Sequence, residues 1–208
     1  MGVTMRWNPD SIRTVFCIAV VTTALAWGPA AALAAETQRA VCELEPGKSA
    51  IQFTLEAALH RVHGAFALKR GTLVVDLDTG KAEGLIVVDA ASGDSGNRSR
   101  DQQMKASVLE VQKFPDITFS PLHVDGHPVR DGAFEARVTG ILQLHGTEHQ
   151  VVLDTHGHLV GERLTVTFHL LIPYVEWGLK DPSILFFAVS KQVDVAVTAE
   201  GAVTWAAQ

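Results

Sequence analysis

The sequence is poor in cysteine, in charge and in aromatic side chains. It has two cysteines among 208 residues, 19% of its residues are charged and 7% are aromatic, whereas 47% are hydrophobic. Two cysteines are too few for a disulfide scaffold, and the chain has too much apolar and too little charged material to be disordered. Its 17 glycines follow no period of three, which excludes collagen. The composition therefore predicts a folded globular protein.

Basic residues are also scarce. The 17 lysines and arginines are outnumbered by 23 acidic residues, which gives a net charge of −6, and no basic run is longer than the dipeptide Lys69-Arg70. Proteins that bind nucleic acid normally carry a basic stripe. The sequence therefore argues against a nucleic-acid partner.

The N-terminal residues have the pattern of an export signal. Arg6 and Arg13 form a basic leader before a largely apolar run at residues 15–27, and Ala32-Leu33-Ala34 has the small-x-small pattern of a signal-peptidase site. This run of 13 residues is shorter than the roughly 20 that a bilayer-spanning helix needs. We therefore expect a signal peptide that is cleaved after Ala34 and an exported protein; a retained membrane anchor is the alternative.

The remaining residues, 35–208, are expected to form one domain. They contain no internal repeat, no low-complexity tract and no Pro/Ser-rich linker that would mark a boundary. Cys17 leaves with the signal, so Cys42 has no intramolecular disulfide partner. A buried thiol is the simplest expectation for it.

Most of this domain alternates between apolar and polar residues with a period of two, which is typical of strands that bury one face. Residues 85–88 are apolar at successive positions, which predicts a strand covered on both faces, and Pro121 is expected to end the strand that begins at Ile117. The other predicted strands lie at residues 51–55, 73–77, 134–144, 151–155, 164–172 and 193–197.

Residues 97–109 predict a helix instead. They are rich in Arg, Gln, Lys, Met and Ala, and Ser95 or Asn97 is the expected N-cap. Arg100 and Asp101 would point about 100° apart on this helix, so each is expected to hold it to a neighbouring loop. Residues 173–178 are a second, shorter candidate.

These elements predict an all-β fold, namely a single extended antiparallel barrel of about eight strands with one or two short helices. Closure of the sheet removes the exposed edges that would otherwise aggregate. A barrel of this size is filled by its own side chains or holds one elongated ligand. A sandwich of two sheets is the main structural alternative.

Five motifs in order resemble those of one family. The most specific is Asn97-Arg98-Ser99-Arg100-Asp101-Gln102-Gln103-Met104, followed by residues 108–110 and 113–119. Residues 44–53 look like the family's first hairpin, residues 63–73 like its second, residues 138–146 like its strand and turn x-G-x-L-x-L-H-G, and residues 177–183 like its late loop. Together they cover residues 41–204, and on them the chain resembles the YceI-like, polyisoprenoid-binding family.

The resemblance implies a lipocalin-like barrel, exported to the periplasm, whose long apolar pore holds a polyisoprenoid or similar amphiphile. No catalytic residues are established across this family, so none is assigned and no enzyme is expected. The residues expected to line the pore are Phe53, Leu55, Phe66, Leu73, Val75, Phe119, Phe134, Val138, Leu142, Val166, Phe168, Leu170, Trp177 and Phe187.

Each of these residues would also suit the ordinary core of a filled barrel. Four cations are candidates for holding a polar or phosphorylated head group, and each is equally explained as solvated surface charge: Arg61, Lys69, Arg70 and Lys180.

The expected function is therefore to hold or carry a long-chain isoprenoid, with no resident cofactor. The expected partners are the lipid ligand and transient contacts with a membrane or a membrane redox protein; the chain is expected to be a monomer or a homodimer. Two alternatives are a ligand-free envelope stress or accessory protein with a filled barrel, and a protein that holds an isoprenoid quinone for a membrane redox partner. The absence of Cys-x-x-Cys-His excludes covalently bound haem.

Histidine-rich segments suggest a metal site only weakly. His156-Gly157-His158 would place two imidazoles on one strand face, and His145 and His149 flank a turn. A zinc site needs three or four converging ligands, and no Cys-x-x-Cys or His-Glu-x-x-His accompanies these residues. We expect no metal, and we expect the His145 ring to bond local backbone.

Gly93-Asp94-Ser95-Gly96 looks like the nucleophile segment of trypsin-type proteases. Only His60 and His63 precede Ser95, and Asn97 and Arg98 stand where that segment continues with glycine and proline. The segment is better interpreted as a polar turn that leads into the helix.

Overall fold

Nine strands account for the alternating apolar residues of the sequence. The computed structural model describes residues 38–57, 60–126, 129–183 and 189–207, so the expected signal at residues 1–34 and the expected pore residue Phe187 lie outside the described residues. The strands are β1 (Gln38–Leu44), β2 (Ala50–Glu56), β3 (Arg61–Asp76), β4 (Ala82–Asp94), β5 (Asp116–Gly126), β6 (Gly132–Leu144), β7 (Thr147–Val160), β8 (Arg163–Ile172) and β9 (Val193–Ala207).

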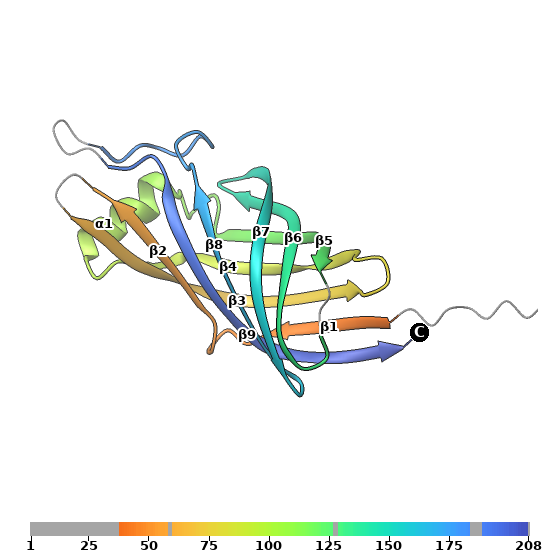
Figure 1. The fold of residues 1–208 in the computed structure, drawn as a ribbon. Coiled ribbons are helices and arrows are strands. Elements are labelled where there is room, and N and C mark those ends of the chain that lie inside the picture. The colour runs from red at the N-terminus through yellow and green to blue at the C-terminus, as the bar shows by residue number, and fades with distance from the viewer. Residues whose placement is uncertain (1–37, 58–59, 127–128, 184–188, 208) are drawn as a thin grey trace, which may run out of the picture. The chain divides into compact units, whose positions relative to one another are not determined.

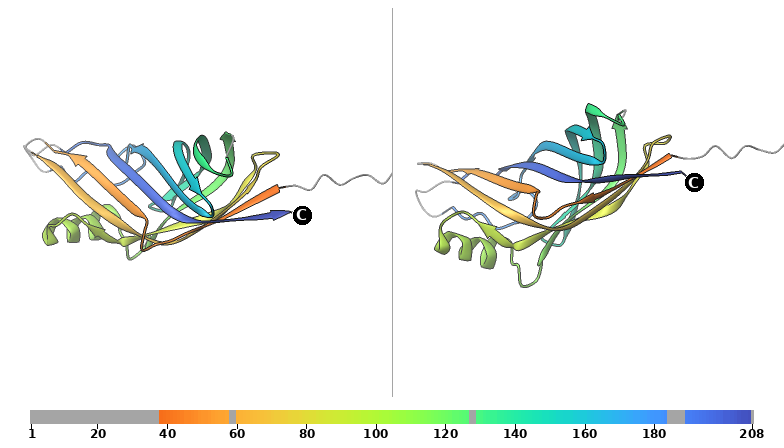
Figure 2. Two further views of the ribbon diagram at one scale, coloured as in Figure 1. Left: turned by 60° about the horizontal axis from the view of Figure 1, so that its bottom comes forward. Right: turned by 90° about the horizontal axis from the view of Figure 1, so that it is seen from below.

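The nine strands occupy eight positions around a closed barrel (Figures 1 and 2). From β3 to β9 each strand pairs antiparallel with the next one along the chain, and β1 and β2 both pair with β3 and with β9. The closed ring confirms the predicted antiparallel barrel and excludes the two-sheet sandwich.

β1 and β2 are two halves of one interrupted strand. Both run antiparallel to β3, with Glu43 opposite Thr72 and Ile51 opposite Phe66. The predicted first hairpin is therefore wrong, because its two arms lie end to end and do not pair with each other. The predicted second hairpin is also wrong, because residues 63–73 lie within the single strand β3.

β5 continues through Pro121, where the sequence predicts it to end. The ladder with β6 shifts its register between Pro121 and His123. Proline cannot donate a ladder hydrogen bond, and a bulge is one of the few places where a strand tolerates it. The bulge lets the strand extend to Gly126.

The apolar run at residues 85–88 is covered on both faces over most of its length. Ile86 and Val88 line an internal cavity, and Val87, which points the other way, is 1% exposed. Leu85, at the start of the run, is 39% exposed.

The predicted helix forms between β4 and β5 as α1 (Arg98–Gln103), which continues into a π-helical turn, η1 (Met104–Val108). Asn97 is the N-cap, and its side chain accepts a hydrogen bond from Arg100 N. At residues 173–178 the structure has a single turn and no helix, closed by a hydrogen bond from Trp177 N to Pro173 O. The helices among the described residues are too short and too polar to cross a membrane.

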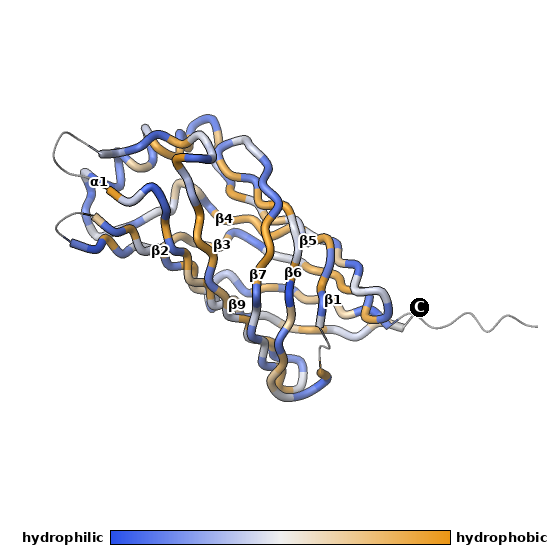
Figure 3. Tube along the Cα trace, turned by 45° about the horizontal axis from the view of Figure 1, so that its top comes forward, coloured by the Kyte–Doolittle hydropathy of each residue, from blue (hydrophilic) through white to orange (hydrophobic). Residues whose placement is uncertain are grey.

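Hydrophobic residues recur along the strands of the barrel, as Figure 3 shows, and they pack into two apolar clusters at different heights. One fills the end where β1 begins and β9 ends; its buried members are Ala40, Cys42, Leu159, Leu164 and Val203. The other lies at the end that carries α1 and includes Leu109, Leu142, Leu153, Tyr174 and Leu179. The first cluster packs one end of the barrel, whereas the second surrounds a void.

Candidate functional site

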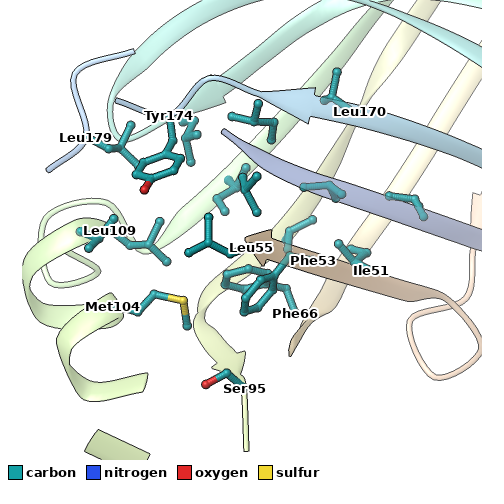
Figure 4. A pocket seen from close by; sticks show the side chains of 18 of the residues that line it. Ile51, Phe53, Leu55, Phe66, Ser95, Met104, Leu109, Leu170, Tyr174 and Leu179 are labelled. Atoms are coloured by element: carbon teal, nitrogen blue, oxygen red, sulfur yellow. The ribbon is translucent and has the colours of Figure 1, made fainter. Parts of the chain in front are cut away.

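An elongated apolar cavity occupies the half of the barrel that carries α1. Its volume is about 730 Å³, within the range of roughly 300–1,000 Å³ that is usual for small-molecule sites. Figure 4 shows Phe53, Phe66, Met104, Leu109 and Tyr174 facing into it from different elements. The wall is almost entirely aliphatic and aromatic, so the cavity suits an apolar chain.

Seven of the residues expected to line the pore do line this cavity: Phe53, Leu55, Phe66, Phe119, Leu142, Phe168 and Leu170. They come from β2, β3, β5, β6 and β8, and the period of two places them on the inner face. The Phe53 and Phe66 rings are 5.3 Å apart with an interplanar angle of 42°, so together they form one aromatic wall.

The other six described residues of that set lie elsewhere. Leu73, Phe134 and Val166 pack against the cluster that fills the far end of the barrel. Val75 is buried opposite Ala40. Val138 and Trp177 pack against the cluster around the cavity without lining the cavity itself.

Polar side chains gather at one end of the cavity, near α1. The residues that form this polar mouth are His60, Ser95, Asn97, Ser99, Arg100 and Gln103. None of the described residues that line the cavity is an aspartate or a glutamate, although the whole chain has a net charge of −6. The mouth therefore presents neutral hydrogen-bonding side chains and one permanent positive charge to whatever occupies the cavity, and no negative charge.

Arg100 and Asp101 both bind the turn that precedes α1, as the sequence predicts. Arg100 Nε donates to Ser95 Oγ at 2.8 Å, and Arg100 Nη2 donates to Ser95 O at 2.9 Å. The Asp101 carboxylate accepts from both the hydroxyl and the backbone N–H of Ser95, and these bonds hold the pKa of Asp101 below its usual range. The Ser95 hydroxyl is thus part of a structural network that fixes Arg100 at the mouth.

The cations considered for a head group lie away from the cavity. Arg61 Nε contacts Glu56 Oε1 at 2.6 Å, and Lys69 Nζ contacts Asp116 Oδ1 at 2.6 Å. Arg70 and Lys180 are exposed. The sequence did hold a signal for Arg100: it shares a helix face with residues 103 and 104, at spacings of three and four, and residue 104 is apolar.

The histidines do not converge. Among the residues that the structure describes, no group of three or more His, Cys, Asp or Glu side chains could hold a metal ion. The expectation that His145 bonds local backbone is wrong, because its Nε2 lies 3.0 Å from Glu110 Oε2 and its ring packs 4.5 Å from the Phe114 ring. His145 and Gly146 both have positive φ, at 54° and 77°, which suits the two-residue turn between β6 and β7.

The segment after β8 covers part of the cavity. Tyr174 and Leu179 are buried and line it (Figure 4). The Tyr174 hydroxyl donates to Ser190 O at 2.7 Å, and burial raises the pKa of Tyr174 to about 12. This hydrogen bond joins the turn after β8 to the residues that lead into β9.

Comparison with known proteins gives one family and one fold. The YceI-like domain family matches residues 43–201. No protein with a curated function matches the chain.

Solved structures that share the barrel include the following three proteins. BcnA from Burkholderia cenocepacia is 19% identical with a TM-score of 0.60, and the match covers 76% of this chain and 98% of that one. A polyisoprenoid-binding domain from Saccharophagus degradans is 17% identical with a TM-score of 0.57, covering 78% and 98%. The YceI protein of Campylobacter jejuni is 16% identical with a TM-score of 0.52, covering 64% and 79%. At these identities the likeness shows a common fold.

Proposed function

Because the chain belongs to the YceI-like domain family, we propose that it is an exported binding protein that holds the tail of a long-chain isoprenoid, or of a similar amphiphile, in its barrel cavity. The proposal assigns no chemical step to the chain. Its parts are an apolar cavity for the tail, a polar mouth for the head group and an export signal.

The cavity is the single observation that carries the proposal. A filled barrel would place side chains throughout its interior, whereas this barrel is filled only at one end and keeps about 730 Å³ of apolar space at the other. An empty apolar void of this size costs stability because its walls lose packing contacts, and a bound apolar tail would restore those contacts. The polyisoprenoid-binding domain from Saccharophagus degradans, which has the same fold, indicates the chemical class of the ligand.

The energetics favour a protein that takes up and releases its lipid over one that retains it irreversibly. Moving a tail of about 40 carbons from water into an apolar site is worth roughly 30 kcal/mol gross, beyond the practical limit near 20 for non-covalent binding. A lipid starts from a membrane, however, where its tail is already out of water. Transfer from membrane to cavity is therefore nearly balanced, which allows the protein to take up and release its ligand.

The mouth indicates the chemistry of the head group. Arg100, Gln103 and Asn97 offer donors, and no carboxylate lines the described part of the cavity. A head group that accepts hydrogen bonds suits such a mouth, whether as the carbonyls of a quinone or the oxygens of a phosphate. A cationic head group does not.

Native mass spectrometry of the protein purified from its own cells tests the proposal. We expect the mass of a chain that begins after Ala34 plus a stoichiometric adduct, which organic extraction releases and lipid analysis identifies as a prenyl compound. A bare protein mass that stays unchanged after incubation with isoprenoid quinones and prenyl alcohols would overturn the binding function. A chain that retains residues 1–34 would overturn the cleaved signal but not the binding.

A further inference from the structure

We propose that the lipid tail enters and leaves the cavity sideways, through the seam between β7 and β8, and that Trp177 closes this seam. The inference rests on the proposed function and adds a route to it. The alternative is that the tail threads end-on through the polar mouth beside α1.

The ladder between β7 and β8 covers six of the 14 residues of β7 and six of the ten residues of β8. The two strands pair from Thr155 opposite Phe168 to Val160 opposite Arg163. Residues 147–154 of β7 pair only with β6, and residues 169–172 of β8 pair only with β9. Figure 1 shows the two strands diverging from their paired ends. At every fully paired seam a tail would have to break backbone hydrogen bonds, whereas here it meets none between the strands.

The cavity lies directly behind this seam. Val151 and Leu153 line it from the unpaired part of β7, and Leu170 and Ile172 line it from the unpaired part of β8. A tail that passes between these side chains reaches the cavity at once. The head group would stay outside until the tail is seated.

The other incomplete ladder differs. β4 and β5 pair only from Ile86 opposite Phe119 to Asp89 opposite Asp116, but the isolated bridge between Lys81 and His123 joins them again farther along. That gap is bounded at both ends. In the described residues no second bridge joins β7 and β8 beyond Thr155 and Phe168, so that end of the seam is not closed by backbone pairing. The turn that follows β8 crosses it instead.

An aromatic stack joins this turn to β7 across the seam, in addition to the buried contacts of Tyr174 and Leu179. The Trp177 ring lies parallel to the ring of His149 on β7, with centroids 3.8 Å apart and an interplanar angle of 7°. His149 Nε2 is buried and has no hydrogen-bond partner among the residues that the structure describes. A buried ring nitrogen without a partner favours any state that exposes it to water, so the closed seam is held by the stack and opposed by this nitrogen.

One apolar pair lies on the outer side of the seam, between the exposed polar residues Gln150, Asp154 and His169. Val152 on β7 is 51% exposed and Leu171 on β8 is 57% exposed. Val152 lies three residues before Thr155, and Leu171 lies three residues after Phe168. If the antiparallel ladder continued in the same register, these two residues would therefore lie opposite each other. An apolar pair on the outside of the opening offers a surface that an emerging tail can contact.

Exchange kinetics test the route. The full protein would be mixed with phosphatidylcholine vesicles that carry a quinone with an eight-unit prenyl tail, and the bound quinone measured over time by native mass spectrometry. In Trp177→Ala we expect uptake and release both to speed up by about fivefold, with little change in final occupancy, because the loss of one stack lowers the barrier in both directions. Trp177→Phe should restore slow exchange.

A second variant is predicted to change the rates in the opposite direction. His149→Phe keeps a ring against Trp177 and removes the nitrogen that lacks a partner, so exchange should slow, which a merely destabilised barrel would not produce. Trp205→Ala is the matched control, because that indole packs at the filled end and should leave the rates unchanged. Normal binding with unaltered rates in both Trp177→Ala and His149→Phe would overturn the route. No bound quinone in any variant would overturn the proposed function instead.

Discussion

The ring of Phe53 lies over Gly64 on the neighbouring strand, so close that a Cβ at residue 64 would stand 2.3 Å from the ring Cζ. The same arrangement recurs where Phe134 covers Gly157, its partner across β6 and β7. In both pairs the glycine provides the space that the ring occupies. The first pair shapes the wall of the cavity, and the second fills the packed end.

Replacing this glycine should therefore destabilise the barrel. Gly64→Ala forces the Phe53 ring out of its place and also meets Asp94 O, so we expect a loss of about 1–3 kcal/mol in the free energy of unfolding, measured by urea denaturation. Gly47→Ala is the matched control, because nothing lies within 4 Å of a Cβ there. Equal losses in the two variants would contradict the packing argument.

Filling the cavity should remove binding and leave the fold intact. Val195 lines the cavity from β9, so Val195→Phe places a ring in the space that the tail needs. We expect the affinity for a prenyl quinone to fall by about tenfold or more, since the ring and the tail cannot share the same volume. Val160→Phe makes the same change at a position that is 57% exposed and outside the cavity. It should bind normally, and thermal unfolding should show both variants folded.

Arg100 should distinguish head groups. We expect Arg100→Gln to lower the affinity for a prenyl phosphate by about tenfold, because a charge-assisted hydrogen bond is lost, and to change the affinity for the matching prenyl alcohol much less. Arg98→Gln makes the same substitution on the same helix at an exposed residue that does not line the cavity. Isothermal titration of each variant with both lipids checks the prediction. Equal effects of the two substitutions would remove Arg100 from the head-group site.

The buried thiol of Cys42 predicts a loss of stability in alkali. Burial raises its pKa from 9.0 to about 11, so between these pH values the folded chain keeps a proton that the unfolded chain releases. Stability therefore falls as the pH rises through this window, by about 2–3 kcal/mol from this group. Urea titrations at pH 8 to 11 should show a shallower decline in Cys42→Ala. Parallel curves for the two proteins would contradict the assignment.

Periodicity predicted the inner face of the barrel, but it did not predict the height of each residue along the axis. Phe168 and Val166 share one phase of β8, yet the first lines the cavity and the second packs against the filled end. The alternation of side chains fixes only which face a residue occupies. Where the void begins depends on the register of every neighbouring strand, and no single segment contains that information.

Contacts between segments that are distant in the sequence could not be predicted from the sequence either. Nothing in the local sequence indicates that Trp177 stacks on His149, because this contact depends on where β7 and β8 separate. The place of Arg100 beside the cavity was missed for a different reason: the sequence predicts only that Arg100 holds the helix to a neighbouring loop, whereas its side chain both binds Ser95 and lines the mouth.

The interrupted first strand has a consequence for how the barrel is made. The barrel closes where β9 pairs with this first strand. Gln38 of β1 lies opposite Ala207 of β9, and the two residues are 207 − 38 = 169 positions apart in the sequence. Pairing of such distant residues is slow, because the entropy of closing the loop opposes it until the contacts form. The walls of the cavity also need β9, which contributes Val193, Val195 and Val197. A chain that lacks β9 thus has no complete cavity, so any loading with the proposed ligand would follow the completion of folding.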